Sequence, residues 1–540
     1  MSSIAPPPAK ATPRQWFGLA VLLLPVTLMT ADLGVLWLAT PYLAADLHPS
    51  SSQILWITDL YGFMTCGFLV VMGTLGDRIG RRKLLMLGSV GVIVASLLAA
   101  YSTSAETLIV ARALLGVAGA AVLPSTLSLI IHMFTDVAQR TRAIAMWVTS
   151  LSVGLAIGPI VGGVLLQSFW WGSVFLIGVP IMLLPLILGP VILPEYRDPN
   201  AGRIDLLSVL LFLLGILPII YAVKHLAEDG AGLVALLSAV VGIAFSVAFV
   251  RLQLRLPNPL LDMKLFANRS FTAALLTLLF GMMALNGVEY LVPQFMQMVS
   301  GLSPLAAGLW LVPGAVGLIA GSQLTPVLTR TVRPAHVITG GLAVALVGFA
   351  LIYLSGAGTQ GVWLSALGLT VVMFGVAPIS VLGTTLAGAS APPEKAGSAS
   401  ATGQTAYDLG LALGIAITGS VAVAVYRSEV AEAVPVGTPA DAAEATRDSI
   451  GSAVDAAAQL PAAAGEQLLA TAREAFTDAF HSTALVSAGI AVLTAVIVLT
   501  LLKHVPPTGA TPEAEPDPEP VPAEPVTASI TGADGKSASE

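Results

Sequence analysis

Apolar runs of about 20 residues recur along most of the chain, and short polar segments separate them. A helix needs about 20 apolar residues to cross a bilayer, because each residue adds ~1.5 Å and the hydrocarbon core is about 30 Å thick. The first run, Trp16 to Leu47, is longer than the apolar core of a cleavable signal peptide. The pattern therefore predicts a chain built from membrane-spanning helices, beginning with this run.

Windows of that length predict fourteen spans. The first six lie near 16–44, 53–75, 84–103, 107–133, 142–168 and 172–193. Two more lie near 204–226 and 230–252. The last six lie near 271–299, 304–328, 335–356, 361–388, 398–426 and 479–503. We therefore expect an all-α polytopic membrane protein with two six-helix bundles and two linker transmembrane helices.

The polar segments between the spans divide the chain into regions. We expect a cytoplasmic N-terminus (1–15), an N-terminal six-helix bundle (16–193), two linker helices (204–252), a cytoplasmic connector (253–270), a C-terminal six-helix bundle (271–503) and a cytoplasmic tail (504–540). The second bundle includes a long external loop at 427–478, which is rich in alanine and has a helix-like stretch from Ala463 to Phe480. The tail from Thr508 is rich in Pro, Glu, Ala and Ser, so disorder is expected there.

Basic residues predict the orientation, because short cytoplasmic loops hold an excess of Lys and Arg. The loops after even-numbered spans hold Arg78, Arg81, Arg82, Lys83, Arg140, Arg142, Arg197, Arg203, Arg251, Arg255, Lys264, Arg269, Arg330, Arg333 and Lys395. In the short loops on the other side of the membrane, the only basic residue is Lys224. This bias places both termini in the cytoplasm and the chain in the cytoplasmic (inner) membrane.

Composition excludes several other classes of protein. With 56% hydrophobic and 10% charged residues, and a mean hydropathy of +0.88, a soluble fold is excluded. The single cysteine, Cys66, and six scattered histidines favour neither a disulfide framework nor a metal site. Much of the net charge of −7 lies in the tail, and no phosphate loop is present. We expect no cofactor, no ATP and no nucleic acid.

The loop after the second span has a distinctive pattern of glycine and charge. Its glycines are Gly73, Gly76 and Gly80, and its charged residues include Asp77, Arg78, Arg81 and Arg82. Glycines permit a tight turn and close helix approach. We interpret Asp77 and the arginines as an ionic latch that biases two conformational states. The alternative is a basic anchor alone, which explains the arginines but not the glycine spacing.

The fourth span contains Arg112, followed by Gly116, Gly119, Ala120 and Pro124. Inserting arginine in a membrane costs roughly 2.5–3.5 kcal/mol, so Arg112 is expected to have a partner or a wet cavity. In the alternative, its long side chain extends to the outer interface.

The fifth span reads Gly154-Leu155-Ala156-Ile157-Gly158-Pro159-Ile160-Val161-Gly162-Gly163. Small residues four apart allow close helix packing, and Pro159 introduces a kink that can serve as a pivot. Ordinary packing explains scattered glycines but seldom this whole string.

Four acidic side chains fall inside predicted spans: Asp32, Asp59, Glu289 and Asp408. Burial disfavours the charged form of a carboxylate, so such a group can lose a proton to bind a cation and regain one to expel it. Helix lengths place Asp408 near the middle of the membrane and the other three in the outer half. For Asp59, close to a helix start, an interfacial polar role is the alternative.

Aromatic and methionine residues surround these acids, and they are candidates for a pocket that binds flat apolar cations. We select Trp37, Tyr290 and Tyr407 from this group. The alternative is that most of them pack the interior.

These motifs resemble those of the major facilitator superfamily. Further segments support the resemblance: Trp170 to Phe175, Pro259 to Asp262 and Gly301 to Gly308. Together they resemble the fourteen-helix EmrB/QacA branch of multidrug:proton antiporters, and within it the LfrA-type and SmvA-type pumps, which export quaternary ammonium compounds, dyes such as ethidium and some fluoroquinolones. The glycine string of the fifth span resembles the motif associated with antiporters. For Arg112, the resemblance implies a part in proton transfer or in tuning a nearby carboxylate.

The resemblance also covers the thirteenth span, and this chain departs from the family there. Gln404-Thr405-Ala406-Tyr407-Asp408-Leu409-Gly410 resembles Glu-Thr-Ala-Tyr-Glu-Leu-Gly of those pumps. Gln404 replaces the first glutamate and Asp408 the second, which leaves one ionisable group fewer. By the resemblance, Gln404 belongs with the substrate pocket.

The sequence therefore predicts a transporter, not an enzyme, that exports lipophilic cations in exchange for protons. Its partners would be drug-like small molecules, protons and the bilayer, and it would act as a monomer. One alternative is a dedicated exporter of a single metabolite, such as an antibiotic, lipid or siderophore. A more remote one is a membrane sensor or membrane-embedded enzyme.

Overall fold

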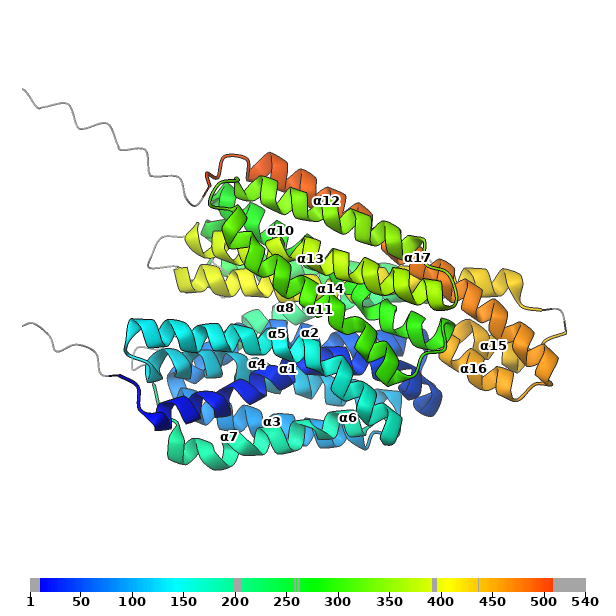
Figure 1. Ribbon diagram of the computed structural model, residues 1–540, viewed down its shortest axis with the longest axis horizontal. Helices are drawn as coiled ribbons and strands as arrows, with labels where there is room; N and C mark the ends of the chain where they lie inside the picture. Colours follow the sequence, from blue (N-terminus) through cyan, green and yellow to red (C-terminus); the bar gives the residue numbers. More distant parts are fainter. Residues whose placement is uncertain are drawn as a thin grey trace, which may run out of the picture.

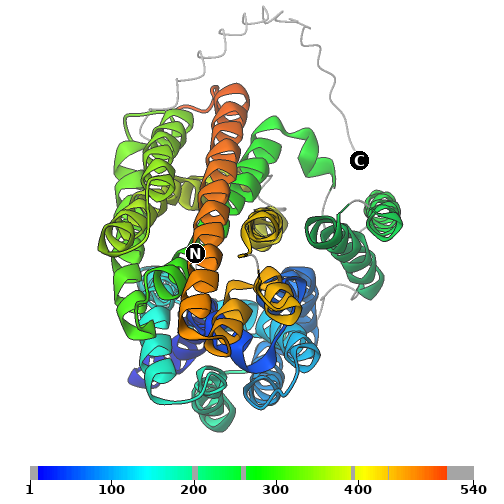
Figure 2. The same ribbon diagram turned by 90° about the vertical axis from the view of Figure 1, so that its right-hand side faces the viewer.

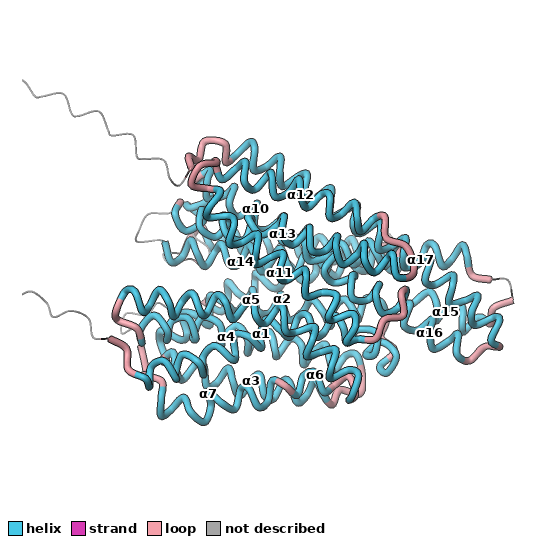
Figure 3. Tube along the Cα trace, viewed as in Figure 1, coloured by secondary structure: helices cyan, strands magenta, loops and turns pink. Residues whose placement is uncertain are grey.

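The computed structural model describes residues 10–197, 205–230, 232–256, 259, 263–390, 396–435 and 437–507. All regular secondary structure in these ranges is helical (Figure 3). The predicted disordered tail and parts of the connector lie outside the described residues. Thirteen of the described helices are long and apolar enough to cross a membrane. Helix α2, bent by 51° between Leu69 and Val71, makes a fourteenth if it is counted as one span.

The first bundle is formed by seven helices that make six spans. They are α1 (Pro13–Leu47), α2 (Ser51–Ile79), α3 (Arg81–Ala100), α4 (Ala105–Met133), α5 (Val137–Ser168), α6 (Ser173–Leu176) and α7 (Gly178–Ile192). Side chains of Ser50, Ser104 and Asp136 accept hydrogen bonds from backbone N–H groups at the starts of α2, α4 and α5. The sixth predicted span is interrupted at Ile177, where α6 gives way to α7.

The second bundle also contains six spans. They are α10 (Arg269–Gln294) with a π-helical turn (Phe295–Val299), α11 (Pro304–Leu328), α12 (Pro334–Tyr353), α13 (Thr359–Ala389), α14 (Ala396–Ala433) and α17 (Ala462–Leu501). The short 3-10 helix η1 (Met263–Ala267) precedes it. The stretch from Ala463 to Phe480, expected in the external loop, is the first half of α17 and continues without a break into its span.

Two helices between the bundles pack on each other: α8 (Leu206–Asp229) and α9 (Leu233–Gln253). The Gln253 side chain donates a hydrogen bond of 2.5 Å to the Ser208 hydroxyl and joins the pair. Helix α8 also contacts α2 of the first bundle and α14 of the second. Much of the apolar side-chain surface of α9 is exposed, as expected for a helix facing lipid.

Two short helices, α15 (Ala440–Asp448) and α16 (Ile450–Ala458), form a cap over one end of the molecule. Figure 1 shows this capped end opposite the end where the described chain begins and finishes, and in Figure 2 the capped end faces the viewer. The bundles converge towards the capped end and diverge towards the terminal end (Figure 1). At the capped end, the Gln297 side chain donates a hydrogen bond of 3.3 Å to the Leu38 carbonyl oxygen of the other bundle.

Helices α2 and α14 pack on each other across the boundary between the bundles. The Cys66 thiol, which is buried, lies 3.6 Å from the carbonyl oxygen of Thr405 and donates to it. A Cβ added at Gly62 would lie 3.4 Å from the Cβ of Ala412. The fold thus holds α2 and α14 in close contact at the level of the predicted acidic residues.

Candidate functional site

The first buried charge pair joins α1 to α4. A guanidinium nitrogen of Arg112 lies 2.6 Å from an Asp32 carboxylate oxygen, with the arginine side chain 0% and the aspartate side chain 18% exposed. Arg112 also donates 3.0 Å to the Ile57 carbonyl oxygen and lies 4.8 Å from the Tyr61 ring centroid. Arg112 therefore does not extend to the interface. It satisfies its charge within the bundle, as expected for a membrane arginine.

The second buried charge pair joins the first bundle to the linker. The Lys224 ammonium lies 2.8 Å from the Asp59 carboxylate, and both side chains are 0% exposed. The ammonium is also 4.2 Å from the centroid of the Trp56 ring. The assignment of Lys224 to an outer loop was wrong, because α8 extends to Asp229 and keeps this lysine inside the packed helices. Asp59 is likewise buried and not interfacial.

One stretch of α2 connects the two pairs. Ile57 supplies its carbonyl to Arg112, while Trp56 and Asp59 contact Lys224. Successive residues on a helix point about 100° apart, so this stretch presents one face to α4 and another to α8. The two charge pairs therefore both contact the same short stretch of α2.

Asp408 lies on α14 where that helix meets α2. Its carboxylate accepts a hydrogen bond of 2.9 Å from Gln404, one turn earlier. Cys66 and Gly62 of α2 contact α14 on either side of Asp408, at Thr405 and Ala412. Neither Asp408 nor Tyr407 is fully buried, and Tyr407 packs against the main core. Three of the four predicted acids thus lie on or beside α2.

Glu289 lies apart from the other acids, on α10. Its side chain is 7% exposed and makes no hydrogen bond or ion pair with the described residues that the structure records. An unpaired buried carboxylate is costly in its charged form, so a protonated side chain or a bound cation suits this position.

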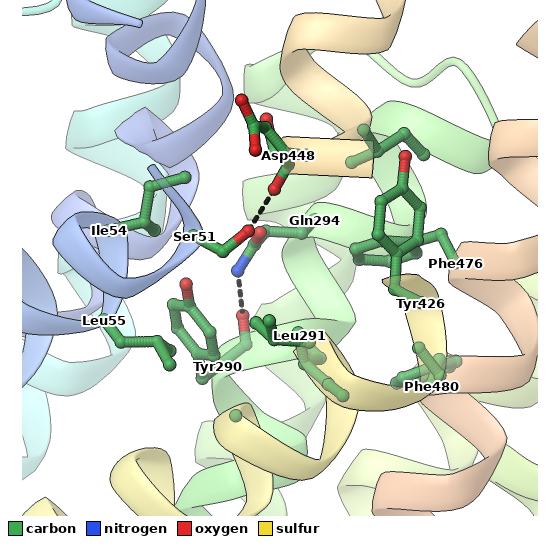
Figure 4. A pocket seen from close by; sticks show the side chains of 16 residues that line it. Ser51, Ile54, Leu55, Tyr290, Leu291, Gln294, Tyr426, Asp448, Phe476 and Phe480 are labelled. Atoms are coloured by element: carbon green, nitrogen blue, oxygen red, sulfur yellow. Dashed lines mark hydrogen bonds between the residues drawn. The ribbon is translucent and has the colours of Figure 1, made fainter. Parts of the chain in front are cut away.

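A pocket lies beneath the cap, between the two bundles (Figure 4). Its aromatic lining comes from Tyr290, Tyr426, Phe476 and Phe480. The Ser51 hydroxyl donates to the backbone carbonyl oxygen of Asp448 at its rim, and Tyr426 donates 2.9 Å to the Thr446 carbonyl oxygen. Tyr290 is the predicted pocket residue found here. Trp37 is 4% exposed within the core, and Gln404 and Tyr407 line no part of this pocket.

The predicted latch region forms ion pairs at the terminal end. Arg81 lies 2.6 Å from Asp77. Arg82 lies 3.5 Å from Glu195, and the backbone N–H of Arg82 donates 3.0 Å to the same carboxylate. Glu195, in the polar segment after α7, was missed as a latch residue because only the fold brings it to α3.

Gly80 is the turn between α2 and α3. Its φ of +113° lies in the region that favours glycine, and an added Cβ would lie 2.7 Å from the Glu195 carboxyl carbon. At Gly76, an added Cβ would lie 3.0 Å from the Arg81 side chain, whereas Gly73 has open space around it. The glycine at 80 is therefore the one that the turn requires.

The glycine string of α5 faces α1 along one side. An added Cβ at Gly158 would lie 2.6 Å from the Ala31 carbonyl oxygen, and one at Gly162 would lie 3.1 Å from the Cα of Val35. Gly154 is equally tight against α1. The helix that carries Asp32 is thus held at a distance that only glycine in α5 allows.

A second side of the same string faces the other bundle. An added Cβ at Gly163 would lie 2.7 Å from the Cα of Leu305 in α11. Gly308 of α11 in turn packs against the backbone of Pro159. The Pro159 segment of α5 therefore lies at the contact between the bundles.

No group of three or more His, Cys, Asp or Glu side chains in the described ranges is arranged to hold a metal ion. The polar chemistry of the described interior consists instead of paired and isolated charges.

Comparisons of the sequence with known proteins identify a family and several relatives. The family model of the Major Facilitator Superfamily matches residues 22–415. The multidrug efflux pump LfrA of Mycolicibacterium smegmatis is 44% identical over 496 residues, covering 91% of this chain and 97% of that protein. The methyl viologen resistance protein SmvA of Salmonella typhimurium is 35% identical over 478 residues, covering 88% of this chain and 96% of that protein.

Solved structures support the fold independently. The crystal structure of a bacterial homologue of the human lysosomal transporter Spinster, in an inward-facing and unoccupied conformation, matches with a TM-score of 0.67 at 17% identity, covering 93% of this chain and 100% of that chain. The predicted fold class and family resemblance are confirmed. With its two six-helix bundles, its linker pair and this match over most of its length, the chain belongs to the Major Facilitator Superfamily.

Proposed function

We propose that this chain is a proton-coupled multidrug efflux transporter of the inner membrane that exports lipophilic, cationic compounds by antiport. The buried Asp32–Arg112 pair is the observation that carries the proposal. The relatives named as a multidrug efflux pump and as a methyl viologen resistance protein support the substrate class. Quaternary ammonium compounds, dyes and fluoroquinolones are the candidate substrates, and the proton gradient replaces any cofactor or ATP.

The Asp32–Arg112 pair supplies the proposed exchange step. When Asp32 is ionised, it is neutralised by Arg112, and a substrate cation that approaches competes for the same carboxylate. When Asp32 takes up a proton, Arg112 keeps its bond to the Ile57 carbonyl oxygen and its place beside Tyr61. The site then carries net positive charge, which favours release of a cation. Asp408 and Glu289 are proposed to extend this exchange into the second bundle.

The capped end is proposed to face outward and the terminal end to face the cytoplasm. Arg81 and Arg82 lie at the terminal end, together with Arg330 and Arg333 at the turn between α11 and α12, which follows the positive-inside rule. The site is proposed to be reached alternately from the two sides as the bundles rock against each other. The transporter is proposed to work as a monomer.

Ethidium efflux from cells tests the proposal. We compare the wild type with Asp32→Asn and Asp408→Asn, with and without a protonophore, at matched membrane levels of protein. Loss of the charge at either acid should lower protonophore-sensitive efflux by at least about a hundredfold, the lower end of what a positioned proton-transfer group typically contributes. Glu466→Gln is the control, because Glu466 is an exposed carboxylate of α17 near the cap.

Each outcome has a definite meaning. A wild type that moves neither ethidium nor another organic cation contradicts multidrug export and favours a dedicated metabolite exporter. Full efflux in both aspartate variants contradicts the assignment of the coupling residues while leaving export intact.

A further inference from the structure

The Asp59–Lys224 pair belongs to neither of the two bundles alone. Asp59 comes from α2, while Lys224 comes from α8 of the linker, and their side chains meet at 2.8 Å with 0% exposure. The Trp56 ring faces the same ammonium at 4.2 Å. A carboxylate beside an aromatic face is the chemistry that binds organic ammonium ions. Here a lysine of the chain itself occupies that arrangement.

The linker helix is firmly seated where it delivers this lysine. Ile220 of α8 is 2% exposed and packs with Phe63 of α2 and with Ala412 and Ala416 of α14. A Cβ added at Gly67 would lie 2.9 Å from the Leu213 side chain of α8. Because α8 fits the seam between α2 and α14, the ammonium is held in place by packing on both sides of the boundary.

The pair also lies next to the proposed exchange site. The Ile57 carbonyl that binds Arg112 is two residues from Asp59 on α2. Leu55, one helical turn before Asp59 on α2, lines the pocket beneath the cap together with Tyr290. An additional negative charge at Asp59 would therefore act on a cation in this region.

We propose that Lys224 is a specificity-determining residue that neutralises Asp59 and so biases the transporter towards singly charged over doubly charged cations. This inference rests on the proposed export of cations. With Asp32 matched by Arg112 and Asp59 by Lys224, two of the four acids contribute no net charge to a substrate. A dication gains less from such a site than from one in which Asp59 is free.

The test measures a ratio, efflux of the dication methyl viologen relative to efflux of the monocation ethidium. Lys224→Met removes the ammonium but keeps the length of the side chain, and it should raise the ratio by about tenfold, typical of gaining one close charge interaction. Lys224→Arg keeps the charge and should keep the wild-type ratio. The double variant Lys224→Met with Asp59→Asn should return the ratio to the wild-type value.

If Lys224 had only a structural role, its substitution would lower the efflux of methyl viologen and of ethidium together. A change in the ratio of the two therefore indicates a role in specificity. An unchanged ratio in Lys224→Met, with ethidium efflux preserved, overturns the inference. If that variant does not reach the membrane, Asp59→Asn replaces it. This variant leaves the lysine charge unmatched and should lower the ratio, and an unchanged ratio there overturns the inference as well.

Failure of the proposed function is recognised separately. If the wild type exports neither cation, the function is contradicted, and the inference is then tested by binding of the two cations to purified protein. Tighter binding of methyl viologen by Lys224→Met than by the wild type supports the inference, and equal binding overturns it.

Discussion

The acidic residues of the interior differ in what surrounds them, and this difference assigns them different tasks. Asp32 faces an arginine, Asp59 a lysine and Asp408 the amide of Gln404, whereas Glu289 has no hydrogen-bond or ion-pair partner among the residues that the structure describes. Removing one member of a buried pair leaves the other charge uncompensated, at a cost of about 3–5 kcal/mol. Substitutions in the pairs should therefore always be compared with the matched double variant.

Outside the membrane, Asp448 at the end of α15 predicts a pH-dependent cap. Partial burial raises the pKa of its carboxyl group, and Glu444 adds to this while Arg427 acts against it. The pKa of Asp448 in the docked cap therefore lies above the pKa of an aspartate in an undocked cap. Docking is favoured most at a pH below the pKa of the undocked aspartate. That advantage is lost as the pH rises through the higher pKa of the docked form.

Hydrogen exchange of residues 440–458 measures this effect. Protection should decrease as the pH is raised from acidic values towards neutrality, after correction for the intrinsic exchange rate. Asp448→Asn should abolish the decrease and give stronger protection at neutral pH. The same pH profile in the variant and the wild type would show that another group is responsible.

The sequence indicated that a charged residue inside a span needs a partner, but it did not indicate which residue the partner is. Arg112 was expected to be paired because a lone charge is costly in the membrane. The choice of Asp32, 80 positions away, follows only from the packing of α1 on α4. Lys224 was misplaced because polar residues near the end of an apolar run resemble the start of a loop. The burial that contradicts this comes from α2 and α14, which are distant in sequence.

At the scale of the helix, the close approach of α5 to α1 predicts a sharp steric limit. Gly158→Ala would place its Cβ 2.6 Å from a backbone oxygen of α1. Because the clashing atom belongs to the backbone, it cannot move away as the end of a flexible side chain could. Overpacking of this kind costs about 1–3 kcal/mol. We expect a lower midpoint of thermal unfolding in detergent and reduced ethidium efflux.

Gly340→Ala is the matched control, because Gly340 is also in a helix but has no neighbouring atom within 4 Å of an added Cβ. It should be neutral or slightly stabilising, since alanine favours helix by about 1 kcal/mol over glycine. Equal destabilisation by both substitutions would contradict the steric explanation and indicate a general intolerance of alanine.

The spans themselves were predicted well because hydropathy reports directly on insertion in lipid. Helix α11, near 304–328 by prediction, has those same bounds in the structure. By contrast, the helix-like stretch from Ala463 to Phe480 was placed in the external loop, and its continuity with the last span was not predicted. The first half of α17 is polar and alanine-rich, and its helical continuity depends on Phe476 and Phe480 packing against the second bundle and on Gly465 packing against α16.

At the scale of the whole molecule, helix α8 of the linker lies at the seam between the two bundles, whereas much of α9 is exposed. Helix α8 contacts both α2 and α14, which themselves pack across the boundary. If the bundles rock against each other, as expected for this fold, α8 follows one of them and must slide on the other. The number of spans follows from hydropathy, but this placement does not, because a linker helix has the same composition wherever it packs.

The contact between α2 and α14 also predicts how exposure changes during transport. Cys66 is buried against Thr405 in the described conformation, so a maleimide should label it slowly. A cation or a proton gradient that separates the two helices should accelerate labelling, and Cys66→Ala should abolish it. Labelling as fast as in the denatured protein, under all conditions, would contradict the close packing seen here.

Because Cys66 is the single cysteine of the chain, the protein already contains a site-specific probe at the boundary between its two halves. A fluorophore or spin label attached to this thiol needs no cysteine-free background, and the native chain can be followed through its cycle in real time. A label pair for distance measurement then requires one engineered cysteine in the second bundle.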